Sequence, residues 1–300
     1  MNLKQFVRSG LNYVELLFKQ SKNPVTLIFA SITAGKKGHV FFKSKSGTTL
    51  RIKVDPLYSL LFLLNRGWKI VEQTDDHIIL KKDVYLKCRY KRGWDLGHIQ
   101  EIFEDGVYGR EPKEYVIDVG ASNADSAIFF AARGASKVLA LEPDPESYQL
   151  TQENIRMNDL QQKVVPLNLA LSASDGVAEF LIPNEQPNAS TLSPTESLSK
   201  VMDFAQGNRV QVNTTTLEAL IERYGLPRID LLKMDCEGCE YSVLRNTKQE
   251  TFRKISDIIL EYHDGPGDLP GLLSHVGFTV KCTATKPLGI IKAHKSETSR

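Results

Sequence analysis

From Tyr115 onward, short apolar segments alternate with segments of helical periodicity, and this alternation limits the possible folds more than any other feature of the chain. Strands alternating with helices indicate a parallel sheet, and nearly continuous apolar strands indicate a sheet covered on both faces. The predicted strands cover residues 115–120, 137–142, 163–171, 228–235 and 257–263, with a closing pair at 278–284 and 288–294. The predicted helices cover residues 123–133, 145–157, 216–224 and 269–276, with one more beginning near Tyr241. The last two-thirds of the chain are therefore predicted to form an α/β domain.

The first third differs in both charge and pattern. Residues 1–100 carry 18 Lys or Arg and 7 Asp or Glu, whereas residues 101–300 carry 20 and 29. The pattern predicts an N-terminal helix, two strands within 39–54, an apolar helix over 57–66 and a hairpin formed by 68–73 and 77–81. Gly106, Gly109 and Pro112 interrupt this pattern. We expect a small basic α+β unit over 1–108, an α/β domain over 109–294 and a disordered tail over 295–300.

The N-terminal helix is amphipathic and basic. Leu3, Phe6, Leu11, Val14 and Phe18 recur at helical spacing, with lysine and arginine on or near the polar side. Two interpretations stay open: the helix packs on its own domain, or it attaches the protein to a membrane surface or another anionic partner. The apolar run 24–34 is shorter than the roughly 20 residues of a membrane span. We expect a cytoplasmic protein, with peripheral attachment to the inner membrane face as an alternative.

The four cysteines are too few and too scattered for a disulfide scaffold. Cys236 and Cys239 have a spacing that metal or redox chemistry can use, but no second cysteine pair or histidine pair completes a zinc site. We expect packing at a strand-to-helix corner, a reducing compartment and no bound metal.

Polar residues follow the first two strands of the predicted sheet. Ligands bind at the carboxyl ends of the strands in an open parallel sheet. Asp118 and Gly120 end the first strand, and a helix follows whose N-terminal N–H groups favour a carboxylate or phosphate. Glu142 ends the second strand, where an acidic side chain suits ribose hydroxyls. These residues predict a site for a nucleoside-bearing cofactor; a tight turn without a ligand is the alternative.

The loop after Gly120 indicates which cofactor fits. Dinucleotide folds use Gly-x-Gly-x-x-Gly because a pyrophosphate lies against bare backbone, and this loop lacks the later glycines and adds Asp125. A ligand with adenosine and amino-acid moieties fits better, since Asp118 or Asp125 can receive its ammonium group. Asn168, after the third strand, either meets an adenine edge or caps a turn.

Ionisable residues gather after the fourth and fifth strands. Lys233, Asp235, Glu237 and Glu240 follow one another at the end of the fourth, and His263 ends the fifth. So many ionisable groups at a ligand-binding edge are costly for a structural role alone. We predict that Asp235, Glu237 and His263 are catalytic, with His263 or Asp235 as the base. The alternatives are helix capping by Asp235 and Glu237 and pairing of Lys233 with Glu261.

Residues 90–294 resemble the FkbM-like methyltransferases, a branch of the class I S-adenosylmethionine-dependent fold. The resemblance is carried by motifs at the strand ends and after them: 116–121, 125–126, 141–145, 170–172, 215–217, 229–240 and 259–263. It implies a Rossmann-like, mostly parallel sheet of seven strands whose last pair is a reversed hairpin. It also implies O-methylation of a sugar, glycan or other small or secondary metabolite, with S-adenosyl-L-methionine as cofactor.

The resemblance also implies positions for the ligands. The residues expected at the cofactor are Asp118, Gly120, Ala121, Ser122, Asp125, Ser126, Glu142, Pro143, Asn168 and Ala170. Ser190, Thr191 and Lys233 are expected at the acceptor, with the polar segment 183–209 forming a lid or binding loop, or else disordered. The sequence departs from the family pattern Gly-Ala-Asn-x-Gly-Asp at Ser122 and Ala124, so we expect weaker or altered cofactor binding.

Three other functions are weighed against this one. A nicotinamide-dependent oxidoreductase is disfavoured by the missing glycines. A nucleic-acid methyltransferase docked by the basic unit is disfavoured because no Asn/Asp-Pro-Pro-aromatic motif and no clear aromatic platform are present. A non-catalytic cofactor-binding relative would bind the cofactor without methylating any acceptor.

Overall fold

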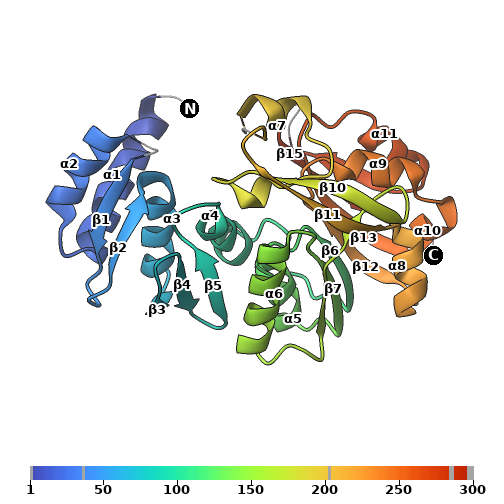
Figure 1. Cartoon of the computed structure of the whole chain (residues 1–300), viewed down its shortest axis with the longest axis horizontal. Coiled ribbons are helices and arrows are strands. Elements are labelled where there is room, and N and C mark those ends of the chain that lie inside the picture. The colour runs from blue at the N-terminus through green and yellow to red at the C-terminus, as the bar shows by residue number, and fades with distance from the viewer. Residues whose placement is uncertain (1–2, 36–37, 202–203, 284–286, 296–300) are drawn as a thin grey trace. The chain divides into compact units, whose positions relative to one another are not determined.

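The computed structural model describes residues 3–35, 38–201, 204–283 and 287–295. The chain divides into two compact units, Met1–Val107 and Tyr108–Arg300. Each unit forms its own arrangement of helices and strands (Figure 1).

The first unit is α+β. Its helices are α1 (Leu3–Gln20), α2 (Pro24–Ala34), α3 (Val54–Asn65) and α4 (Asp95–Ile99), which continues as a π-helical turn over Gln100–Asp105. Its strands form the hairpin β1 (His39–Lys43) and β2 (Thr49–Lys53) and the antiparallel sheet β3 (Lys69–Gln73), β4 (His77–Lys81) and β5 (Tyr85–Arg89). The sequence pattern did not predict α2 as a helix or β5 as a strand. In β5 the charged Arg89 is buried because Asp95 pairs with its guanidinium at 3.0 Å.

The second unit contains a seven-stranded sheet in the order β14-β15-β13-β12-β6-β7-β8. These strands are β6 (Tyr115–Val119), β7 (Lys137–Leu141), β8 (Val164–Leu167), β12 (Ile229–Met234), β13 (Ile255–Tyr262), β14 (Thr279–Cys282) and β15 (Gly289–His294). The pairs from β8 to β13 are parallel, and β15 runs antiparallel to both β13 and β14. The predicted fold class, including the reversed C-terminal hairpin, is confirmed.

Helices connect these strands and supply the rest of the core. They are α5 (Asp125–Ala132), α6 (Pro145–Met157), α8 (Leu217–Tyr224), α9 (Cys239–Asn246), α10 (Gln249–Arg253) and α11 (Leu269–His275). Strand residues such as Ile117, Leu139 and Leu232 are completely buried among them. Because helices bury these strand residues, the strands could be recognised as apolar runs in the sequence.

The predicted third strand, 163–171, is broken in the structure. After β8 the chain forms β9 (Ala170–Leu171), which pairs in parallel with β11 (Asn208–Thr215) in a separate sheet that also contains β10 (Gly176–Ile182). The break falls at Asn168, whose amide donates to the carbonyls of Glu142 and Pro143 and so turns the chain toward β7. The prediction of one continuous strand was wrong because a side-chain bond to residues so distant in the chain cannot be inferred from apolar periodicity.

Two predicted segments have partial outcomes. Between β10 and β11 the chain forms a 3₁₀ turn (Pro187–Ala189) and helix α7 (Glu196–Val201). Of the predicted tail, residues 296–300 lie outside the described residues, while the backbone N–H of Lys295 donates to the carbonyl of Ser256.

None of the described helices is long and apolar enough to cross a bilayer.

Candidate active site

Gly120 ends β6 at the edge of the sheet where a ligand was expected. Its φ is +75°, and a Cβ built there would lie 1.9 Å from the carbonyl oxygen of Asp235. Only glycine therefore lets the loop after β6 lie directly against the end of β12. The two loops that carry the predicted cofactor and catalytic residues touch at this point.

Ser122 and Ala124, the two departures from the family pattern, both have left-handed backbone conformations, with φ of 47° and 66°. A non-glycine residue in that region costs roughly 1–2 kcal/mol. The backbone thus explains why the pattern has glycine at position 124. Ser122 keeps its conformation through its own bonds: its carbonyl accepts from the Thr151 hydroxyl at 2.6 Å, and its hydroxyl accepts from the Asn188 amide at 3.0 Å.

Glu142 lies beside this loop at the end of β7 and is almost completely buried. Its Oε2 accepts from the backbone N–H of Ser122 at 2.7 Å, and its Oε1 accepts from that of Asp144 at 2.9 Å. A carboxylate has about four acceptor positions, so the same oxygens can also accept from ribose hydroxyls. Asp144 caps α6, accepting from the N–H groups of Glu146 and Ser147.

Asp118 and Lys233 form a buried ion pair beneath the loop, with Nζ 3.0 Å from Oδ1. The Ser126 hydroxyl donates to the other oxygen of Asp118 at 2.6 Å, and Nζ also donates to the Gly120 carbonyl at 2.8 Å. Burial alone would lower the pKa of Lys233, but the carboxylates of Asp118 and Asp235 outweigh it and raise that pKa. Lys233 is therefore held against the loop after β6, and it pairs with Asp118 and not with Glu261. Its expected place at the acceptor stays a prediction.

The remaining predicted cofactor residues lie in the loops after β6, β7 and β8, at the start of α5 and in β9. Asp125 begins α5 and accepts from the N–H of Ser126 at 2.7 Å. The N–H of Ala121 donates to the carbonyl of Leu141, which fixes the loop to β7. Pro143 is buried, whereas Asn168 is exposed and both of its amide bonds go to backbone carbonyls. Ala170 is buried in β9, in the separate sheet. The amide of Asn168 therefore joins the loop after β8 to the loop after β7, and its expected contact with adenine stays a prediction.

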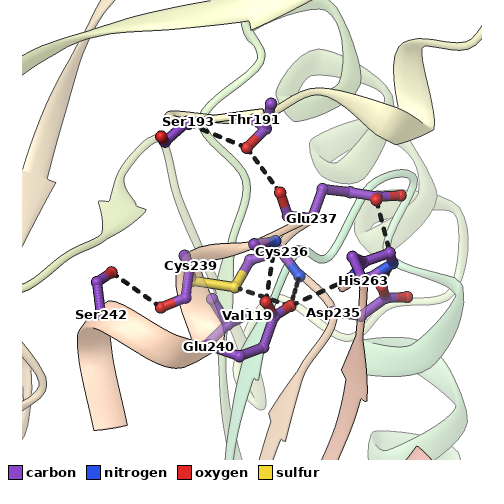
Figure 2. Close-up of a disulfide and its surroundings, with 12 residues drawn as sticks. Val119, Thr191, Ser193, Asp235, Cys236, Glu237, Cys239, Glu240, Ser242 and His263 are labelled. Atoms are coloured by element: carbon purple, nitrogen blue, oxygen red, sulfur yellow. Dashed lines mark hydrogen bonds and ion pairs between the residues drawn. A yellow bond between two sulfur atoms is a disulfide. The ribbon is translucent and has the colours of Figure 1, made fainter. Parts of the chain in front are cut away.

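Asp235, Glu237 and His263 meet at the ends of β12 and β13 (Figure 2). Nε2 of His263 lies 3.1 Å from Oε2 of Glu237 and 3.7 Å from Oδ1 of Asp235. The donor atoms of the three residues all lie within 4.8 Å of one another, a spacing that a metal ion can bridge. The sequence led us to expect no metal here.

Glu240, which the sequence analysis did not assign to the site, orients this cluster from below. It is fully buried and accepts from the N–H groups of Cys236 and Gly238, and its Oε1 lies 3.6 Å from Nδ1 of His263. His263 is thus placed among three carboxylates. Glu240 follows Glu237 by three residues, a spacing that also occurs in ordinary helix capping. The sequence therefore did not reveal this role of Glu240.

The carboxylates change the ionisation of the cluster. Burial alone would lower the pKa of His263, but Glu240, Glu237 and Asp235 together raise it to about 10. Burial and the neighbouring Asp235 raise the pKa of Glu237 to about 8, against the opposing charge of His263. At neutral pH the imidazole therefore carries a proton and is not in the form that accepts one.

Cys236 and Cys239 form a disulfide, contrary to the packing role expected from the sequence. The bond closes the turn that contains Glu237, whose φ is +56°, and Gly238. Two cysteines separated by two residues can be bridged wherever a turn brings them together, and the composition of the chain does not reveal that turn. The covalent link holds the backbone of Glu237 in place beside His263.

The segment between β10 and β11 extends over both halves of the site. Asn188 binds the hydroxyl of Ser122, the Thr191 hydroxyl donates to the Glu237 carbonyl at 2.7 Å, and that of Thr195 donates to the His263 carbonyl at 3.1 Å. Ser190 donates its hydroxyl to the Pro187 carbonyl at 2.6 Å within the segment itself. Of the two predicted acceptor residues in this segment, Thr191 therefore contacts the turn that contains Glu237, and Ser190 supports the turn after Pro187.

Tyr108, the first residue of the second unit, is a further neighbour of the site that the sequence analysis missed. Its ring lies 5.6 Å from Nζ of Lys233. Burial, with the charges of Asp235 and Asp118, raises the pKa of its phenol. Its position just before a glycine-rich boundary gave no periodic signal.

Comparison with known proteins adds an independent finding. The family model described as "Methyltransferase FkbM domain" matches residues 118–280, more than half of the chain. The chain is 28% identical over 210 residues to "Methyltransferase sdnD" of Sordaria araneosa, which covers 60% of this chain and 81% of that protein. It is 26% identical to "31-O-demethyl-FK506 methyltransferase FkbM" of Streptomyces tacrolimicus, over 66% of this chain and 90% of that protein.

Two more matches have lower identity or coverage. The chain is 25% identical to "Hexuronic acid methyltransferase AglP" of Haloferax volcanii, over 63% of this chain and 73% of that protein. A solved structure of a methyltransferase FkbM from Methylobacillus flagellatus matches with 14% identity and a TM-score of 0.44, covering 65% of this chain and 48% of that one.

Proposed function

The chain belongs to the FkbM methyltransferase family, and from this membership we propose that it transfers a methyl group from S-adenosyl-L-methionine to a hydroxyl group of a sugar, glycan or other small or secondary metabolite. One observation supports this most directly. The loop after β6 and the turn after β12 meet at Gly120 and Asp235, so a cofactor beside Glu142 and an acceptor beside Asp235 would be adjacent. Methyl transfer needs that adjacency, because the acceptor oxygen must lie in line with the methyl carbon.

The cofactor half would hold adenosine and amino-acid groups. Glu142 presents buried carboxylate oxygens to ribose hydroxyls, and Asp125 places a negative charge near the N-terminus of α5, where an ammonium group can bind. S-adenosylmethionine would supply the electrophilic methyl group there. Asp118 supports this half from beneath, since it is paired with Lys233 and is fully buried.

The acceptor half would remove the hydroxyl proton. Of the two bases considered, His263 is protonated at neutral pH because its pKa is raised to about 10. Asp235 is partly exposed and lies 3.7 Å from that imidazolium. We therefore assign proton removal to Asp235, with His263 and Glu237 positioning the hydroxyl and balancing charge.

The acceptor class rests on the names of relatives together with the polar lining of the site. One relative is named for a hexuronic acid and another for 31-O-demethyl-FK506, and both names favour an acceptor that carries hydroxyl groups. Beside Glu237, the Thr191 hydroxyl donates to the Glu237 carbonyl and accepts from the Ser193 N–H, so the segment over the site is polar there.

The test combines binding with turnover. Titration calorimetry with S-adenosylmethionine measures cofactor affinity, and radiolabelled methyl transfer to a panel of monosaccharides, lipid-linked glycans and macrolides measures activity. We expect cofactor binding, and label in at least one hydroxylated acceptor that is lost in Asp235→Asn. Binding without transfer to any acceptor would instead support a non-catalytic relative, and no binding at all would refute the cofactor assignment.

A further inference from the structure

Exposed apolar side chains are concentrated in one part of the first unit. Among the described residues, nine large apolar side chains are exposed, and six of them lie between residues 11 and 41. Three of these six are on α2: Val25, Phe29 and Ile32. They are spaced four and three residues apart, so they share one face of the helix.

That face of α2 is unusual for a helix in contact with water. Phe29 is 66% exposed and Ile32 is 74% exposed, while Leu27 is the only fully buried residue of the helix. The helix contains no charged residue from Pro24 to Ala34. An exposed helix normally places polar residues outward. We therefore expect this face to contact an apolar partner.

Neighbouring elements add to the exposed apolar surface. Leu11 and Phe18 of α1 and Phe41 of β1 are each more than half exposed. The Tyr13 hydroxyl contacts that of Ser31, which joins α1 to α2 at 2.9 Å. The Asn23 amide donates to the Phe41 carbonyl at 2.8 Å, which joins the beginning of α2 to β1. The three elements that carry the exposed apolar residues are therefore fixed to one another.

Exposed basic residues lie near the start of α2. Residues 1–54 contain ten Lys or Arg and a single acidic residue, Glu15, which already pairs with Lys19. The N–H of Lys22 donates to the carbonyl of Lys43 at 2.7 Å, so both residues lie at the start of α2, and both are exposed. Lys45 is exposed beside them, its N–H donating to the Gln20 carbonyl at 3.0 Å.

We propose that α2 and its basic surroundings bind the surface of an anionic lipid bilayer, with the face formed by Val25, Phe29 and Ile32 inserted at the level of the headgroups. An uncharged apolar face next to clustered lysines is the combination that interfacial helices use. Each lysine near an anionic surface contributes about 1 kcal/mol. Eleven residues of helix span about 16 Å, roughly half of the hydrocarbon core, so α2 would lie in the surface and not cross it.

Charge favours a membrane over two other partners. A second copy of the chain would bring two strongly basic surfaces together, and like charges across an interface cost several kcal/mol. A nucleic acid would satisfy the lysines but leave the apolar face of α2 in water. An anionic bilayer matches both the charge and the apolar residues.

The experiment is co-sedimentation of the full-length protein with vesicles of phosphatidylcholine, with or without phosphatidylglycerol. We expect binding only to the vesicles that contain phosphatidylglycerol, and a loss of at least tenfold in Phe29→Ser/Ile32→Ser and in Lys43→Glu/Lys45→Glu. The matched control is Val177→Ser, which removes an equally exposed apolar side chain from β10. Thermal melting followed by circular dichroism verifies that each variant is folded.

Three results would overturn the proposal. The first is vesicle binding that is absent or is unchanged in the folded Phe29→Ser/Ile32→Ser variant. The second is a dimer in light scattering that this variant converts to a monomer, which would assign the face to a second copy. The third is RNA binding that only the lysine variant abolishes, together with no vesicle binding.

Discussion

Nε2 of His263 lies 3.1 Å from Oε2 of Glu237, across the ends of two adjacent parallel strands. His263 directly follows β13, and Glu237 lies in the disulfide-closed turn after β12. At neutral pH His263 carries a proton, and the pKa values of both groups depend on Asp235 and Glu240 as well.

The stability of the protein should fall as the pH rises through the range in which this pair titrates. His263 has a pKa of about 10 in the folded state against an ordinary value of 6.5, so its contribution is complete below 6.5 and is lost toward pH 10. Glu237, raised to about 8, acts in the same direction, because the folded state retains a proton that the unfolded chain releases. Urea denaturation at several pH values should show this decline in the wild type.

The control for that measurement is the double variant His263→Gln/Glu237→Gln, in which neither group titrates. We expect its free energy of unfolding to depend less on pH between 6.5 and 10 than that of the wild type. Parallel pH profiles for the two proteins would show that the pair does not hold the proton.

Asp235→Asn should lower kcat by about 10²–10⁴, the usual contribution of a general base. The amide has nearly the same shape, so the affinity for S-adenosylmethionine should change only a few-fold. Glu222→Gln, an exposed carboxylate on α8, is the control for charge removal and should leave kcat unchanged. Labelled methyl transfer measures the first quantity and calorimetry the second; full activity in Asp235→Asn would remove the base from this position.

Glu142→Gln should weaken binding of S-adenosylmethionine at least tenfold. One of the two carboxylate oxygens that we expect near the ribose would become an NH₂ group, which donates and does not accept. Its effect should appear in the Kd for the cofactor and in the KM for the cofactor, more than in the KM for the acceptor. Thr151→Val removes a different contact to the same loop, at the Ser122 carbonyl, and separates loop support from direct binding. Equal Kd values for wild type and Glu142→Gln would disprove a role in ribose recognition.

Ala124→Gly and Ala127→Gly remove the same methyl group from two fully buried positions in and beside α5. Only Ala124 has a positive φ, so glycine releases strain there, whereas at Ala127 it only weakens a helix. We expect Ala127→Gly to be less stable than Ala124→Gly by about 2 kcal/mol. Thermal or urea denaturation gives the difference; equal stabilities would mean that Ala124 is unstrained.

Reduction of the disulfide between Cys236 and Cys239 should lower activity without lowering cofactor affinity. Closing so short a loop stabilises by at most about 2 kcal/mol, so the fold should survive. The freed turn would hold Glu237 less firmly beside His263. The experiment compares kcat and cofactor Kd with and without dithiothreitol, using Cys282→Ser, which removes a thiol outside the disulfide, as the control that keeps the response. An unchanged kcat after complete reduction would argue against this coupling.

The sequence predicted the sheet well because its strands are apolar on both faces, and it predicted the position of Asp235, Glu237 and His263 because parallel strands bring their carboxyl ends to one edge. It could not predict features that depend on single contacts. The buried Arg89 conceals β5 until Asp95 is placed beside it, and the side-chain bonds of Asn168 divide an apolar run into two strands. The ion-pair partner of Lys233 has the same origin, since only the structure shows that Asp118, and not Glu261, holds its ammonium group.

The ionisation of the cluster also lies beyond sequence reasoning. A histidine at a strand end is an ordinary candidate for a base. The surrounding Glu237 and Glu240 reverse that expectation by raising the pKa of His263 to about 10. Three-dimensional neighbours, and not chain neighbours, decide which side chain can accept a proton.

The missing side chain at Gly120 leaves no spacer between the two loops that end β6 and β12. Any displacement of Asp235 that makes room for an incoming alcohol must press on the backbone of Gly120. Occupancy of one ligand position should consequently change the affinity at the other, by the same factor in both directions.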